Sequence, residues 1–233
     1  LSSRRQRQMC IRDSNSTNLT ITSLGGAIEI EGVRGDSSET ISISADKGAA
    51  GSDVETVLIG EGGIGELNQI LTVDITAADG ITLEGDIITS NGGENANVTL
   101  TGKTFISGDV TIDTDNADED GVIKFTSTVD SKSGSTGNLT ILAGDTDDNG
   151  GIDFEGIIGG TTALGTLNIN ATAGTVAITV PQIGTGNNDG AADDGKGAGA
   201  TSIGNAASGD ITLSATGVDL SLIHISEPTR RLC

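Results

Sequence analysis

Residues 108–130, GDVTIDTDNADEDGVIKFTSTVD, are followed at residues 137–160 by GNLTILAGDTDDNGGIDFEGIIGG, a stretch of the same design that begins 29 residues later. In each stretch two short runs alternate Ile, Val, Leu or Phe with polar residues, and an acidic segment separates the runs. Alternation with a period of two is typical of strands that bury one face. Gly, Asn and Asp favour the turns between strands. The pair therefore predicts a repeated strand–loop–strand module.

The same alternation recurs along most of the chain, and no window shows the 3.6-residue spacing of an amphipathic helix. An all-β chain is therefore expected. The expected strands lie at residues 18–22, 27–32, 40–44, 71–76, 80–85, 97–102, 109–114, 121–127, 138–142, 151–156, 166–170, 175–180 and 210–215.

A longer repeat is also present, because GELN at 65–68 recurs as GTLN at 165–168. An offset near 100 residues predicts two β-repeat units, residues 15–132 and a truncated second copy at 133–219. Within the second unit, residues 184–210 are rich in Gly, Ala, Asn and Asp and interrupt the alternation. This composition predicts a mobile loop or low-complexity insertion, or a binding loop displayed from a rigid scaffold.

Two architectures fit short strands at this spacing. One is a right-handed β-solenoid (β-helix), in which each module makes a turn and stacked aliphatic residues fill a narrow core. The other is a tandem array of β-sandwiches. Sandwiches usually contain a buried Trp or a corner Tyr, and this chain has neither. We expect the β-solenoid.

The two ends differ from the rest in composition, since they carry the only His, the only Met and both Cys residues. One short DNA inverted repeat can encode both MCIRDS, residues 9–14, and LSLIHI, residues 220–225, and the two ends resemble translated sequencing-adapter sequence. Such scars are excluded from fold reasoning. We therefore expect residues 1–14 and 220–233 to be foreign to the protein.

The remaining residues, 15–219, are strongly acidic. Six Lys or Arg residues stand against 31 of the 33 acidic residues, which gives a formal charge of −25. Binding to nucleic acid or to anionic lipid depends on Lys and Arg that neutralise phosphate. Nucleic acid is therefore excluded as a partner, and cations are favoured. No stretch approaches the roughly 20 apolar residues of a membrane span, so no membrane insertion of this segment is expected.

No pattern in residues 15–219 indicates catalysis. The segment has no His or Cys, its basic residues are isolated, and it contains no serine-hydrolase, zinc-protease or phosphate-loop motif. Its carboxylates are abundant but share similar surroundings, which gives no separation of acid and base roles. The chain is expected not to be an enzyme.

The acidic segment DTDDNGGIDFEG predicts a calcium site formed by Asp145, Asp147, Asn149 and Asp153. Alternating carboxylates in a tight turn converge on one hard cation, and glycine permits the bend. The pattern departs from a helix–loop–helix calcium loop, because Gly156 occupies the place of the final Glu. The alternative is a solvated acidic turn between two strands.

The cadence GNLTILAG…GGIDFEGIIGGTTALGTLNINATAGTVAIT resembles the repeat regions of filamentous-haemagglutinin-like adhesins and related β-strand-repeat proteins. The resemblance covers most of residues 105–219 and, more weakly, 15–104. It implies a non-catalytic fragment of a large bacterial surface or secreted protein, located extracellularly or at the cell surface, that acts as an adhesin or structural stalk. It also implies a host-cell, matrix or glycan receptor and neighbouring repeats of the same chain as partners. A calcium-stabilised β-sandwich array from an extracellular matrix or surface layer is the alternative.

Overall fold

The computed structural model shows a chain built from β-strands, turns and bends, and the described residues contain no helix. All the strand pairs that it describes are parallel. The prediction of an all-β chain is confirmed. The structure describes residues 10–12, 18–35, 39–45, 54–66, 70–89, 96–114, 121–143, 151–171, 176–179, 198–205 and 211–214.

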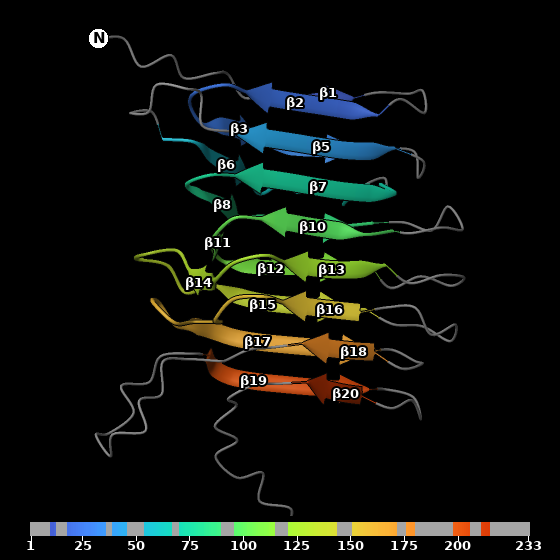
Figure 1. The fold of residues 1–233 in the computed structure, drawn as a ribbon, viewed down its shortest axis with the longest axis vertical. Coiled ribbons are helices and arrows are strands. Elements are labelled where there is room, and N and C mark those ends of the chain that lie inside the picture. The colour runs from blue at the N-terminus through green and yellow to red at the C-terminus, as the bar shows by residue number, and fades with distance from the viewer. Residues whose placement is uncertain are drawn as a thin grey trace, which may run out of the picture.

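The strands form three long parallel sheets (Figure 1). Sheet 1 has eight strands: β2 (Leu19–Ser23), β5 (Thr40–Ala45), β7 (Thr72–Ala77), β10 (Val98–Thr101), β13 (Val122–Phe125), β16 (Gly151–Phe154), β18 (Val176–Thr179) and β20 (Ile211–Ser214). Sheet 2 has five: β3 (Ile28–Ile30), β6 (Thr56–Ile59), β8 (Gly80–Leu83), β11 (Thr104–Ile106) and β14 (Val129–Ser131). Sheet 3 has five: β9 (Ile87–Ile88), β12 (Asp109–Asp113), β15 (Asn138–Leu142), β17 (Leu164–Ala171) and β19 (Ala198–Asn205).

From β7 to β15 the chain visits the three sheets in a fixed order. It passes through β7 in sheet 1, β8 in sheet 2 and β9 in sheet 3, and then returns to sheet 1 as β10, which pairs with β7. In Figure 1 the strands of sheet 1 run to the left in front, and the chain returns behind them as it descends, so the coil is right-handed. The predicted right-handed β-solenoid is confirmed. The alternative of a β-sandwich array is wrong, because sandwiches pair their strands antiparallel.

The 29-residue offset between the two quoted stretches equals one turn of the solenoid. Asp109 pairs with Asn138, 29 residues later, and Phe125 pairs with Phe154 at the same offset. In sheet 2, by contrast, β11 and β14 pair with the 25-residue offset that also separates Asn97 from Val122. The extra residues of the longer turn therefore lie between β14 and β15. Insertions fall at the corners and leave the strands in register.

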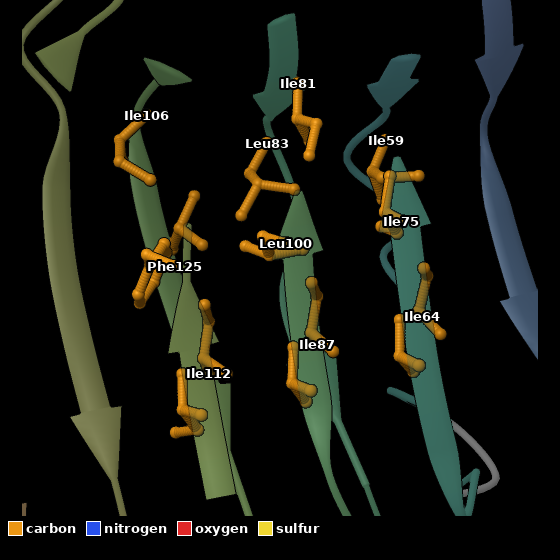
Figure 2. Packing of buried hydrophobic residues seen from close by; sticks show 14 of the residues in the cluster. Ile59, Ile64, Ile75, Ile81, Leu83, Ile87, Leu100, Ile106, Ile112 and Phe125 are labelled. Atoms are coloured by element: carbon orange, nitrogen blue, oxygen red, sulfur yellow. The ribbon is translucent and has the colours of Figure 1, made fainter. Parts of the chain in front are cut away.

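One hydrophobic core runs along the solenoid from Ile28 to Ile169. It follows from the alternation, because most of the residues that face inward on the three sheets are Ile, Val, Leu, Ala or Phe. Figure 2 shows inward-facing side chains of successive turns in rows, with Ile64, Ile87 and Ile112 forming one row. Each turn therefore buries its apolar residues against the same positions of the turns before and after it.

Phe125 and Phe154 are stacked within this core. Both are fully buried, their ring centroids lie 4.7 Å apart, and their planes are inclined by only 3°. Parallel strands are spaced by about 4.7–4.9 Å, so in-register pairing itself brings two rings to stacking distance.

Glycines at two corners allow successive turns to approach closely. Gly102 has a φ of +127°, and a Cβ there would strike the carbonyl oxygen of Ala77 in the turn before. A Cβ at Gly121 would strike the carbonyl oxygen of Ala96. Larger residues at these corners would force the turns apart.

Polar side chains also join successive turns. In sheet 3, Asn138 Nδ2 donates to Asp109 Oδ1 at 2.6 Å, and Thr166 Oγ1 donates to Asn138 Oδ1 at 3.1 Å. The Thr111 backbone N–H donates to Asp86 Oδ1 at 2.6 Å. These side-chain hydrogen bonds satisfy polar groups that the strand pairing does not satisfy, and they help to fix the register of successive turns.

Part of the segment predicted as a mobile loop is a strand. Residues 198–205 form β19, which pairs with β17 and places Ile203 opposite Ile169. The loop prediction is wrong for these residues. Their backbone groups pair with the edge of β17, and a Gly- and Ala-rich sequence gives no sign of such pairing. Residues 184–197 and 206–210 lie outside the described residues.

The predictions about units and ends are not decided by the fold. The boundary between residues 132 and 133 falls between β14 and β15 of one turn. At the N-terminal end, β1 (Cys10–Arg12) pairs in parallel with β4 (Gly32–Arg34). Residues 220–233 lie outside the described residues, so the adapter-derived origin of both ends stays a prediction.

Candidate functional site

Two acidic segments connect sheet 3 to sheet 1. Residues 115–120 join β12 to β13 and residues 144–150 join β15 to β16, while residues 90–95, which hold a single acidic residue, join β9 to β10 one turn earlier. The strands on both sides of these segments pair in register from turn to turn. The three segments are therefore equivalent in successive turns, although their own residues lie outside the described part of the structure.

The predicted calcium ligands divide into two groups. Asp145, Asp147 and Asn149 lie outside the described residues. Asp153 is described, and it lies on the outward face of β16. Among the described residues, no three His, Cys, Asp or Glu side chains form a group that could hold a metal ion. The calcium site thus depends on residues 144–150 and stays a prediction.

Asp153 belongs to a small charge cluster around Lys124. Lys124 Nζ lies 3.3 Å from Asp153 Oδ2 and 2.5 Å from Glu155 Oε1. Hydrogen bonds from its ammonium group, first to Glu155 and then to Asp153, raise the pKa of Lys124 above its ordinary value. A lysine that acts as a general base needs a lowered pKa. This cluster is therefore suited to joining β13 to its neighbour and unsuited to proton abstraction at neutral pH.

Threonine hydroxyls close the bases of two of these three connecting segments, residues 90–95 and 115–120. Thr89 Oγ1 donates to the Ala96 carbonyl at 2.8 Å, and Thr114 Oγ1 donates to the Gly121 carbonyl at 3.1 Å. Both threonines are buried. The two strand ends that flank each segment are consequently held together at a fixed neck, in the manner of a compact surface loop.

Sheet 1 carries a second candidate surface, which the alternation alone did not indicate. Eight outward-facing positions of β2, β5, β7 and β10 form two columns, and we call this array the hydroxyl face. In-register pairing stacks one residue of each strand per column. One column consists of Thr22, Ser44, Thr76 and Thr101, and the other consists of Thr20, Ser42, Asp74 and Thr99.

Sheets 2 and 3 have no two adjacent columns built almost entirely of Thr and Ser among their described residues. One outward column of sheet 2 reads Glu29, Leu58, Thr82 and Phe105. One outward column of sheet 3 reads Ile88, Asp113 and Leu142, and the column beside it reads Thr111, Thr140 and Asn168. Among the described residues, the full array of two hydroxyl columns over four strands thus occurs on sheet 1.

A signal for this face is present in the sequence as repeated hydroxyl residues two apart, in LTIT at 19–22, ISIS at 41–44 and VTLT at 98–101. The turns between them differ in length, so the sequence alone does not show that the pairs are stacked. Their alignment requires the strand register.

No helix in the described residues is long and apolar enough to cross a membrane. No family model matches the chain, and no curated protein or solved structure is detectably similar to it.

Proposed function

We propose that this chain is a non-catalytic rod segment of a large, repetitive bacterial surface or secreted protein, acting as an adhesin or a structural stalk. The observation that carries the proposal is the single core that continues unbroken from turn to turn. A core of this kind grows by adding turns and gives a stiff scaffold whose length is set by their number. The acidic net charge of −21 suits a solvated surface that repels other anionic surfaces.

The adhesin and stalk roles differ in whether the segment itself binds a receptor. The test is saturable binding of the labelled full chain to host cells, matrix proteins and a glycan array, together with small-angle scattering of the free protein. Saturable binding would identify an adhesin, and an elongated particle without binding would identify a stalk. A compact particle, or turnover of a polysaccharide on the array, would contradict the proposal.

Calcium is the proposed cofactor, because equivalent acidic segments recur at one corner of successive turns. Strand spacing is about 4.7–4.9 Å, so carboxylates at this corner repel one another unless cations intervene. Sites of this class in extracellular modules bind calcium in the range of about 0.1–1 mM. The proposed ligands remain Asp145, Asp147, Asn149 and Asp153.

Thermal unfolding followed by far-UV circular dichroism tests this cofactor. A ligand present at 100 times its Kd stabilises the folded state by about 2.7 kcal/mol, so excess Ca²⁺ is expected to raise Tm by several degrees relative to EDTA. The double variant Asp145→Asn, Asp147→Asn should lose this rise. If Tm is the same with Ca²⁺ and with EDTA, the acidic segments are solvated turns.

A further inference from the structure

The hydroxyl face has the regularity of a two-dimensional lattice. Neighbouring parallel strands lie about 4.7–4.9 Å apart, and residues two apart on one strand lie about 6.6 Å apart. These two repeats run at right angles to each other. In Figure 1, β2, β5, β7 and β10 lie one below another with nearly the same direction, so the lattice persists over these turns.

The face is nearly neutral on a strongly acidic chain. Seven of its eight positions are Thr or Ser, and Asp74 is the exception. Lys124 follows Thr99 in the same column and marks the point where charged residues begin. A surface built to bind an ion, a charged polymer or a basic protein would carry charge here. A neutral hydroxyl lattice favours a neutral, hydrogen-bonding partner.

The side chains of the face are also held in place. Five of the eight are threonine, whose branched Cβ restricts χ1, and all project from a hydrogen-bonded sheet. Fixed hydroxyls lose little conformational entropy when they bind. A bound water costs up to about 2 kcal/mol to immobilise, but water that is already part of a crystal carries no such cost. A rigid hydroxyl lattice therefore favours ordered water over liquid water.

We propose that the hydroxyl face of sheet 1 binds the surface of ice. In the crystal planes that contain the hexagonal axis of ice, water oxygens repeat at two perpendicular distances close to the two repeats of the face. Each hydroxyl contributes a weak contact, and simultaneous engagement of successive turns makes the sum effective. This inference goes beyond the rod function and does not depend on it.

The experiment uses the full chain and measures thermal hysteresis, the gap between the melting and freezing temperatures of a single ice crystal. Thr76 lies near the centre of the face, so Thr76→Lys places a long charged side chain within the lattice. The matched control is Thr140→Lys, an outward, half-buried threonine on β15 of sheet 3. Asp74→Thr completes the second column with a hydroxyl residue and tests whether the thermal hysteresis increases.

The proposal expects measurable hysteresis for the unaltered chain and labelling of crystal planes parallel to the hexagonal axis by fluorescent protein. Thr76→Lys should lose most of the hysteresis, Thr140→Lys should retain it, and Asp74→Thr should increase it several-fold. Circular dichroism establishes that each protein is folded.

Three results would overturn the proposal. The first is a folded, unaltered chain without hysteresis, and the second is an equal effect of the two lysine substitutions. The third is a dimer in sedimentation that Thr76→Lys dissociates, because the face would then be covered by a second copy of the chain.

Discussion

At the scale of single residues, the core depends on a few side chains that match the spacing of the turns. Phe125 and Phe154 occupy the same inward position in neighbouring turns and are the largest fully buried side chains among the described residues. Most other core positions hold Ile, Val, Leu or Ala. The paired rings therefore fill a wider section of the interior than aliphatic residues would.

Phe154→Ala is expected to lower the free energy of unfolding by about 3–5 kcal/mol, because it opens a cavity and removes a stacking partner from Phe125. Urea denaturation measures the change. Phe105→Ala is the control, since Phe105 lies on the outward face of β11 and is only half-buried. Equal losses for the two substitutions would show that the stacked pair has no special part in stability.

The pKa of Lys124 provides a second residue-scale prediction. Because the folded-state pKa is raised, the contribution of Lys124 to stability is present below the ordinary lysine pKa and is lost as the pH rises through the raised value. Glu155→Gln should bring the pKa of Lys124 down further than Asp153→Asn does, since the hydrogen bond to Glu155 is the larger cause. An NMR titration of the Lys124 side chain measures this, and an unchanged pKa in both variants would contradict the assignment.

At the scale of elements, buried threonines close two of the corners between sheet 3 and sheet 1. The bonds from Thr89 and Thr114 repeat one turn apart. The next turn has Ala143 at the equivalent position, because Asp113 pairs with Leu142. The threonine hydrogen bond that forms the neck is therefore present in two successive turns and not in the next one.

Thr114→Val keeps the shape of the side chain but removes the hydroxyl that satisfies the Gly121 carbonyl. The expected loss of stability is about 1–3 kcal/mol, the cost of an unsatisfied buried acceptor. Chemical denaturation of Thr114→Val and of the outward-facing Thr140→Val measures the difference. The neck has no energetic role if the two variants are equally stable.

The elements also show what the sequence could and could not predict. Alternation was sufficient for β12, β13, β15 and β16, because each buries alternate apolar residues. It failed for β14, whose Asp130 and Ser131 are buried. Asp130 Oδ1 accepts hydrogen bonds from the Thr161 and Thr162 backbone N–H groups at 2.7 and 3.1 Å, partners that a hydrophobic pattern does not reveal.

The hydroxyl face could not be predicted for a related reason. Its strands are separated by unequal turns, such as the 22 residues from Asn18 to Thr40 and the longer step from Thr40 to Thr72. The residues that stack in one column can be identified only when the number of residues in each corner is known. The calcium ligands, in contrast, were proposed from a single local stretch, and only Asp153 of the four lies among the described residues.

At the scale of the whole molecule, the turn is the unit that can be added or removed. Val98 pairs with Ile123 and Thr104 pairs with Val129, at the 25-residue offset seen between Asn97 and Val122. A segment from Val98 to Val122 thus contains one complete turn. Its removal would join Asn97 to Ile123 and bring β13 against β7.

Deletion of residues 98–122 is expected to leave a folded solenoid with a cooperative melt and a modestly lower Tm, because each turn contacts only its neighbours. Deletion of residues 98–109, about half a turn, should abolish the melt, since it would place a strand of sheet 3 beside sheet 1. Circular dichroism distinguishes these outcomes. Similar melting of the two deletion proteins would show that register between turns does not hold the fold together.

The direction of the inter-turn hydrogen bonds has a mechanical consequence. Because the sheets pair turn to turn, these bonds lie along the axis of the rod, and a tensile force on its ends loads one turn at a time. A yielding turn would release between 22 residues, as from Leu19 to Ile41, and 35 residues, as from Val176 to Ile211, or about 70–120 Å of extended chain. A rod of this construction would lengthen in many small steps and dissipate a pull gradually, where a globular domain would give way in one large event.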